Sequence, residues 1–189
     1  MKAFKVTQQE WLKEATRYIQ GGLHKSAYLI VDTPVVGVFR RMQVDEEICK
    51  TLGYEVVETY NNASTVVHSR GDFLFGHFCP IENGWRERFI EYFVEWLKSK
   101  SLSAEYDGND ILVDGYKVCG TCITRYGRID YTAGFIGINT NINHIRAICK
   151  KPMVKIPKGL ADYGITTEDV EKMFIEFCAN DKGGENDAI

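Results

Sequence analysis

The sequence predicts an α+β domain in which mixed, mostly antiparallel β-sheets pack with helices. Short apolar runs bounded by Gly, Asp, Asn or Pro recur along the chain, which is the pattern of strands joined by turns. A few other segments repeat their apolar residues at helical spacing instead. Because these strands and helices do not alternate strictly, a doubly wound parallel sheet is disfavoured.

Single strands are predicted over the short apolar runs, at 27–31, 34–39, 55–60, 64–68, 72–78 and about 129–138. Residues 108–122, "GNDILVDGYKVCGTC", read as the two strands of a hairpin, because an Asp-Gly pair favours a type I′ turn. Lys117 follows this turn, between Tyr116 and Val118. A lysine on a strand is usually only a solvated surface residue, so a role for its ammonium group depends on what lies near it.

Helices are predicted from capping residues and from the spacing of apolar residues. Thr7–Glu10 has the form of a capping box, and Gly21-Gly22 ends the helix that follows it. Shorter helices are predicted at 45–53 and about 141–149, and Asn83 is expected to cap a long one. The apolar faces of the long helix and of the last helix contain Trp85, Phe89, Ile90, Phe93, Trp96 and Leu97, and Val170, Met173, Phe174 and Phe177.

Length and composition describe a globular chain. Its 189 residues are 44% hydrophobic and 12% aromatic, so residues 1–178 are expected to form a single domain and 179–189 a mobile tail. The net charge of −3, with mixed signs and no basic stripe, argues against nucleic acid as a partner. The chain has no apolar run of membrane-spanning length, and residues 1–20 lack a secretory core. We therefore expect a cytoplasmic protein without a membrane partner.

The cysteines are interpreted as reduced thiols that mostly serve as small apolar side chains. Cys119-x-x-Cys122 is the one close pair, and a structural zinc site would need two further ligands at similar spacing. The pair also lies within a strand pattern, whereas a redox pair usually opens a helix. A metal or redox role for these residues, or for His77-x-Cys79, is the alternative.

Several short motifs together point to a known family. Asn109-Asp110, the strand "ILV", the Asp-Gly turn and "KVCGTC" (117–122) match a pattern of Asn-Asp, strand, turn and Lys-(Val/Ile)-(Ser/Ala)-Gly-x-Ala. "VVGVFRRMQ", "YTAGFIGIN" and "VKIPKGLADYGITTEDVEKMF" match further segments. In these motifs the chain resembles the catalytic domain of lipoate–protein ligase, in the biotin and lipoate ligase family. The resemblance implies a biotin/lipoate ligase-like, class II synthetase-like catalytic domain over residues 1–178.

One family loop is altered in this chain. The family reads Arg-Arg-x-(Ser/Thr)-Gly-Gly-Gly-x-Val-x-His-Asp-x-Gly-Asn, and residues 58–72 read "ETYNNASTVVHSRGD". The arginines are absent, and Asn62-Ala63-Ser64 replace the three glycines. Glycines let the backbone of such a loop approach a ligand closely, so their replacement should reshape the pocket. The resemblance implies that Asn62, Ser64, His68 and Asp72 border the substrate. His68 has a structural alternative, as a satisfied residue at a strand end.

The resemblance also implies the chemistry of the site. Lys117 would be the catalytic residue, with its ammonium group directed at the oxygen that gains charge during acyl transfer. Asn109, Asp110, Gly120 and Thr121 would bind the adenylate formed from ATP, and Asp110 would hold Mg²⁺ directly or through water. For Asn109 and Asp110 the alternative is a polar turn that enters a strand.

Three functions remain open at this stage. The first is a lipoate–protein ligase-like enzyme that activates lipoate or a related short acyl acid with ATP and acylates a lysine of a carrier domain. The second is an ATP-independent transferase between acyl carriers, which needs a nucleophilic cysteine. Its usual position is held by about Asp130, so Cys79, Cys119 or Cys122 would have to substitute. The third is a catalytically impaired relative that binds a carrier domain or an adenylate.

Overall fold

The computed structural model describes residues 3–8, 25–38, 44–58, 65–80 and 84–181. The helix predicted after Thr7–Glu10 and the positions of Asn62 and Ser64 lie outside these residues. Within the described part of the chain, no helix is long and apolar enough to cross a membrane.

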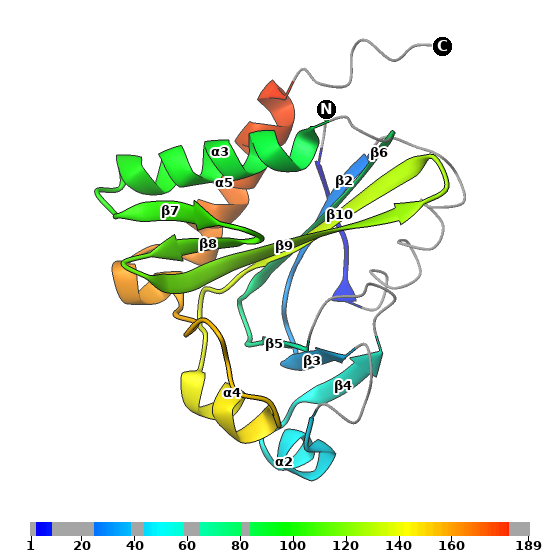
Figure 1. Ribbon diagram of the computed structural model, residues 1–189, viewed down its shortest axis with the longest axis vertical. Helices are drawn as coiled ribbons and strands as arrows, with labels where there is room; N and C mark the ends of the chain where they lie inside the picture. The colour runs from blue at the N-terminus through cyan, green and yellow to red at the C-terminus, as the bar shows by residue number, and fades with distance from the viewer. Residues whose placement is uncertain (1–2, 9–24, 39–43, 59–64, 81–83, 182–189) are drawn as a thin grey trace.

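The described strands form two sheets (Figure 1). The larger is a seven-stranded sheet that is antiparallel except for the β1–β2 pair. In spatial order its strands are β1 (Ala3–Lys5), β2 (Lys25–Ile30), β6 (Phe73–Pro80), β10 (Ile129–Ile136), β9 (Tyr116–Tyr126), β8 (Asp110–Val113) and β7 (Ala104–Asp107). The smaller sheet contains β4 (Glu55–Glu58), β3 (Val35–Val38) and β5 (Val66–His68). The predicted α+β class is confirmed.

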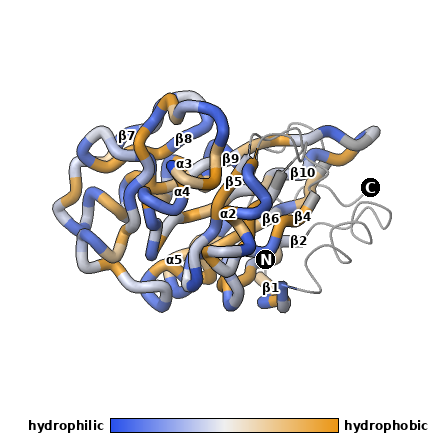
Figure 2. The backbone as a smooth tube through the Cα atoms, turned by 90° about the horizontal axis from the view of Figure 1, so that it is seen from below, coloured by the Kyte–Doolittle hydropathy of each residue, from blue (hydrophilic) through white to orange (hydrophobic). Residues whose placement is uncertain are grey.

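Helices cover each sheet separately. The long helices α3 (Trp85–Ser99) and α5 (Thr167–Asn180) pack on one face of the large sheet through an aromatic core that includes Phe75 and Phe174. The short helices α2 (Glu46–Thr51) and α4 (Ile142–Ile148) pack by the small sheet (Figure 1). Hydrophobic positions follow the central strands, and hydrophilic stretches occupy many of the outer connections (Figure 2).

Some predicted boundaries are wrong. The cap of α3 is Gly84, in a left-handed conformation (φ 69°) that suits glycine, and the expected cap Asn83 precedes it outside the described residues. Strand β7 and the 3-10 turn η2 (Leu160–Tyr163) were not expected. Helix α5 runs to Asn180, and the Asp181 carboxylate pairs with Arg88.

Two buried polar side chains belong to the framework near the small sheet. The Asp72 carboxylate accepts backbone N–H bonds from Ser69, Ile138 and Asn139 at 2.7, 2.7 and 3.0 Å, and so joins the turn before β6 to the chain after β10. Burial raises the pKa of Asp72 to about 6 although these bonds lower it. His68 packs edge-on against Phe135, with ring centroids 5.4 Å apart. Burial lowers the pKa of His68 to about 4.

We predict that His68 makes folding stability fall as the pH decreases. Its pKa lies below the ordinary value of 6.5, so between about pH 6.5 and 4 the unfolded chain binds a proton that the folded chain excludes. From pH 7 to pH 5 the wild type should lose on the order of 2 kcal/mol more free energy of unfolding than His68→Gln. Urea titrations at both pH values measure this difference. The raised pKa of Asp72 makes folding more stable as the pH falls, and it does so equally in the wild type and the variant. An equal loss of unfolding free energy in the two proteins would contradict the prediction.

Candidate functional site

A bulge in the β8–β9 hairpin determines where Lys117 points. The turn residues Asp114 and Gly115 have φ angles of 51° and 79°, as the predicted type I′ turn requires. Further along, Leu112 pairs with Lys117 but Asp110 pairs with Gly120, because the register shifts between Ile111 and Leu112. Lys117 and Gly120 are three residues apart, so a regular strand would place them on opposite faces. The bulge places Lys117 on the same face as Gly120 and Asp110.

The Lys117 ammonium group is held on that face by three neighbours. Its Nζ lies 2.7 Å from Oδ1 of Asp110 and 5.3 Å from the centroid of the Phe135 ring. A Cβ at Gly120 would lie 2.8 Å from the Phe135 ring and 3.0 Å from Lys117 Nζ, so glycine leaves the space that both side chains fill. Lys117 is 25% exposed and therefore does not extend freely into solvent.

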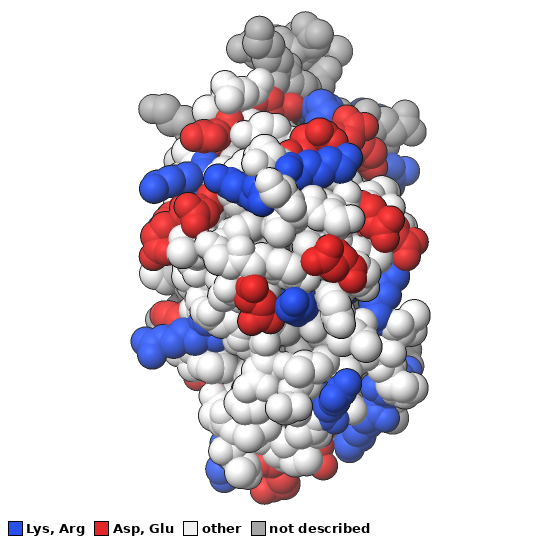
Figure 3. All heavy atoms as spheres, turned by 90° about the vertical axis from the view of Figure 1, so that its left-hand side faces the viewer, with Lys and Arg blue, Asp and Glu red and all other residues white. Residues whose placement is uncertain are grey.

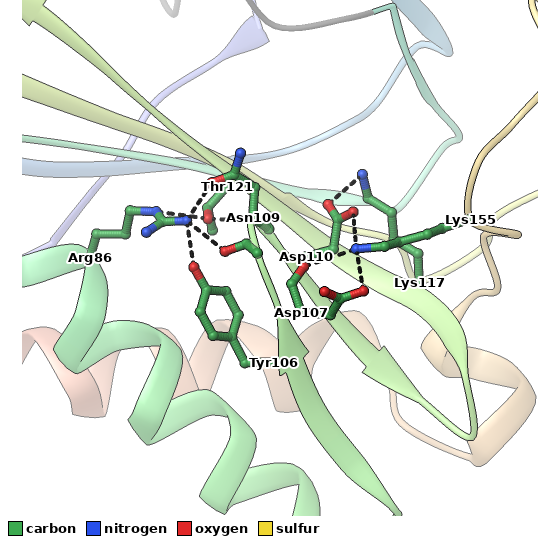
Figure 4. A network of polar contacts seen from close by, with 9 residues as sticks. Arg86, Tyr106, Asp107, Asn109, Asp110, Lys117, Thr121 and Lys155 are labelled. Atoms are coloured by element: carbon green, nitrogen blue, oxygen red, sulfur yellow. Dashed lines mark hydrogen bonds and ion pairs between the residues drawn. The ribbon is translucent and has the colours of Figure 1, made fainter.

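A second ammonium group reaches the same carboxylate (Figure 4). Lys155, from the connection after α4, lies 3.1 Å from Oδ2 of Asp110 and 2.9 Å from Oδ2 of Asp107. The β-bridge between Lys117 and Pro157 fixes this connection, since Lys117 N–H donates to the Ile156 carbonyl at 2.9 Å. Asp110 therefore contacts one ammonium group through each of its oxygens.

These groups line a cavity of about 620 Å³, a size typical of small-molecule sites. Its wall combines apolar side chains from β5, β10, α4 and the segment 152–157 with charged and polar ones from the β7–β8 turn and nearby. The apolar side chains are those of Val66, Val67, Phe135, Ile145, Pro152, Met153, Val154 and Pro157, and the polar ones include Asp107, Asn109, Asp110, Lys117, Lys151 and Lys155. The cavity can therefore receive a ligand with an apolar chain and a charged group.

Arg86 at the start of α3 clamps the β7–β8 turn from the other side (Figure 4). Its Nη2 donates to Asn109 Oδ1 at 2.7 Å and to the Tyr106 hydroxyl at 2.9 Å, and its Nε donates to Thr121 Oγ1 at 3.0 Å. The guanidinium is buried, so each of these bonds replaces lost hydration. Asn109 and Thr121 are thereby fixed beside Asp110.

The structure brings together only some of the residues that the sequence predicted as a site. Lys117, Asn109 and Asp110 line the cavity, and Gly120 lies behind Lys117. Thr121, His68 and Asp72 are buried and are not among the lining residues. Thr121 is part of the Arg86 clamp, and His68 packs against the lining residue Phe135.

Sequence reasoning missed Lys155, Arg86 and Phe135. Lys155 lies in the segment "VKIPKGLADYGITTEDVEKMF", which was matched to the family without a role for this lysine, and its contact with Asp110 depends on the fold. Arg86 follows Trp85 on an aromatic helix, where one charged residue gives no distinctive signal. Phe135 lies in the segment "YTAGFIGIN", which was matched to the family as a whole, and one apolar residue in an apolar strand gives no distinctive signal.

Two of the three cysteines that could replace the transferase nucleophile, Cys79 and Cys119, are not suited to nucleophilic chemistry. Burial raises the pKa of the Cys119 thiol far above its usual range and that of Cys79 to about 11, so both stay protonated at neutral pH. Cys79 donates to the Asp130 carbonyl, and the Asp130 carboxylate accepts two bonds from Arg125. Among the described residues no three His, Cys, Asp or Glu side chains form a metal-binding group.

Mg²⁺ does not fit at Asp110 as the residues stand. The ion prefers carboxylate and phosphate oxygens, and here the two Asp110 oxygens each contact an ammonium group at 2.7 and 3.1 Å. An ion bound there would lie beside two like charges. Asp110 as a magnesium ligand is therefore not supported by this geometry.

The fold is shared by solved structures of low sequence identity. A T. acidophilum protein assigned as a lipoate protein ligase, with bound lipoic acid, has a TM-score of 0.77 and 15% identity over 94% of this chain and 84% of its own. A second structure comes from work on the bipartite lipoate protein ligase of Thermoplasma acidophilum and its E2 lipoyl domain. It has a TM-score of 0.75 and 15% identity, over 94% of this chain and 81% of its own. A structure of lipoate-protein ligase A bound with ATP has a TM-score of 0.75 and 16% identity, over 94% of this chain and 81% of its own.

Sequence comparison assigns the family. No curated protein sequence matches the chain. A sequence profile, that of the lipoyl protein ligase A/B catalytic domain, matches residues 9–176, which is most of the chain and includes every cavity-lining residue. This protein belongs to the lipoyl protein ligase A/B catalytic domain family.

Proposed function

We propose that this protein activates lipoate or a related short acyl acid with ATP and transfers the acyl group to a lysine of a carrier domain. The observation that carries the proposal is the Lys117 ammonium group, held at the wall of a cavity that also has an apolar side. The family and the fold support it, because structures with the same fold contain lipoic acid or ATP.

Both steps of this reaction develop negative charge on oxygen. In the first, a carboxylate oxygen of the acid attacks the α-phosphorus of ATP, and pyrophosphate leaves. In the second, the neutral amine of the carrier lysine attacks the acyl carbonyl, AMP leaves, and the nitrogen loses its proton. An ammonium group directed at the charged oxygen lowers such a barrier by about 3 kcal/mol where water is excluded. This is the role we assign to Lys117.

The two kinds of cavity wall suit the two parts of an acyl-adenylate. Val66, Val67 and Ile145 provide apolar contacts for a short acyl chain, and Asn109 and Lys151 lie on the polar wall where phosphate and ribose would bind. Mg²⁺ enters this proposal as the ion carried by the ATP phosphates, and no step is assigned to an ion on Asp110. The carrier would be a lipoyl or other acyl carrier domain, as in the system that includes an E2 lipoyl domain.

A second candidate is a catalytically impaired relative that binds a carrier domain or an adenylate. It is favoured by the loop in which Asn62-Ala63-Ser64 replace three glycines of the family pattern. The ATP-independent transferase has less support, because the thiols of two of its three candidate cysteines, Cys79 and Cys119, are buried and protonated.

We predict that Lys117→Met strongly slows adenylate formation without unfolding the protein. Removing one transition-state charge contact should slow lipoate-dependent ATP–pyrophosphate exchange by about 100-fold or more. Lys98→Met is the matched control, since Lys98 is half exposed on α3 and pairs with Glu95 one turn away. Exchange at the wild-type rate in Lys117→Met, with circular dichroism unchanged, would contradict the role.

The same preparation separates the alternatives through mass spectrometry of a lipoyl domain. A mass increase that requires ATP supports the ligase. Transfer from an acylated carrier without ATP supports the transferase. Binding of the carrier with neither exchange nor transfer identifies the impaired relative and rejects the proposed reaction.

Gly120→Ala tests the placement of the ammonium group while keeping Lys117. The new methyl group would lie 3.0 Å from Nζ of Lys117 and 2.8 Å from the Phe135 ring, so one of the two must move. We expect exchange to slow by about tenfold or more. The melting temperature should change little, because the Lys117 side chain at the cavity wall can shift to make room. An unchanged exchange rate would show that the position of this nitrogen does not limit the reaction.

A further inference from the structure

The Lys155 ammonium group occupies a site formed entirely by oxygen atoms. Its Nζ lies 2.9 Å from Oδ2 of Asp107, 2.9 Å from the backbone carbonyl oxygen of Asp107 and 3.1 Å from Oδ2 of Asp110. A lysine ammonium group has three N–H donors, and three oxygens surround this one. Hydrogen bonding to Asp107 raises the pKa of Lys155, so the group stays charged.

Two carboxylates and a carbonyl are also the oxygen ligands that hard divalent cations prefer. Asp107 and Asp110 flank the Gly108-Asn109 turn, so their side chains meet at one point of the cavity wall. Lys155 lies at this point. The chain therefore places its own positive charge where a bridging ion would bind.

The position of Lys155 is fixed by the strand that carries Lys117. On either side of the Lys117–Pro157 bridge, Lys117 N–H donates to the Ile156 carbonyl at 2.9 Å and Lys158 N–H donates to the Lys117 carbonyl at 3.0 Å. Lys155 directly precedes these bonds. Among the described residues, the ammonium groups that contact Asp110 are those of Lys117 and Lys155.

We propose that Lys155 is a built-in cation that takes the place of a protein-bound divalent ion at the Asp107–Asp110 pair. In this chain, Lys117 and Lys155 together provide the positive charge at the nucleotide side of the cavity, where the family resemblance implied a magnesium ion on Asp110. The assignment of that side to a nucleotide rests on the proposed function. The cation position itself does not.

The test measures Mn²⁺ binding to the whole chain in the absence of nucleotide and acyl acid. The concentration of free Mn²⁺ is monitored by electron paramagnetic resonance. Mn²⁺ has the same preference for carboxylate and carbonyl oxygens as Mg²⁺. We expect Lys155→Met to gain one Mn²⁺ site that binds about tenfold or more tightly than any site of the wild type. The double variant Lys155→Met/Asp107→Asn should lose this site again.

Lys151→Met is the matched control, because Lys151 lines the same cavity and its loss changes the net charge equally. Lys155→Gln serves as the second neutral variant should Lys155→Met fail to fold. A wild-type Mn²⁺ site that disappears in Asp107→Asn would overturn the proposal, since the ion then displaces Lys155. A folded Lys155 variant that gains no site, or a Lys151→Met variant that gains the same site, would overturn it as well. None of these outcomes depends on ligase activity.

Discussion

The carboxylate of Asp110, placed between two ammonium groups, is the constraint on which the site depends. One of its oxygens contacts Lys117 at 2.7 Å and the other contacts Lys155 at 3.1 Å. These side chains come from β8, β9 and the connection after α4, and only the folded chain brings them together. Two further features serve this contact. The bulge turns Lys117 toward Asp110, and the glycine at position 120 leaves room for the Lys117 side chain.

The hairpin shows how far the sequence could predict this arrangement. Asp114-Gly115 specifies the turn by its preference for positive φ, and the motif around Lys117 identifies the residue. The register shift near Ile111 has no local signal, because both strands are apolar there. Lys155 could not be predicted, since its partners are set by the path of the chain and not by spacing. The cap of α3 was misplaced at Asn83, because glycine also suits that position when φ is positive.

Aligned residues do not always keep a place in the cavity. His68 and Asp72 occupy family positions, but both are buried in the framework, where Asp72 joins two turns through three backbone N–H groups. At these two positions the likeness to the family pattern reflects the fold as much as the ligand. The surface carries acidic and basic side chains interspersed over the upper part of one face, with a larger uncharged area below them (Figure 3). The charges that carry the proposed chemistry are instead gathered at the cavity wall.

The central claim is that Asp110 acts by holding Lys117 in place over the cavity. A double-mutant cycle of Asp110→Asn and Lys117→Met, measured as the rate of lipoate-dependent ATP–pyrophosphate exchange, tests it most directly. The account predicts that Asp110→Asn slows exchange strongly, and that the same substitution has a much smaller effect when Lys117 is already Met. Wild-type exchange in Asp110→Asn, or losses that multiply in the double variant, would contradict it.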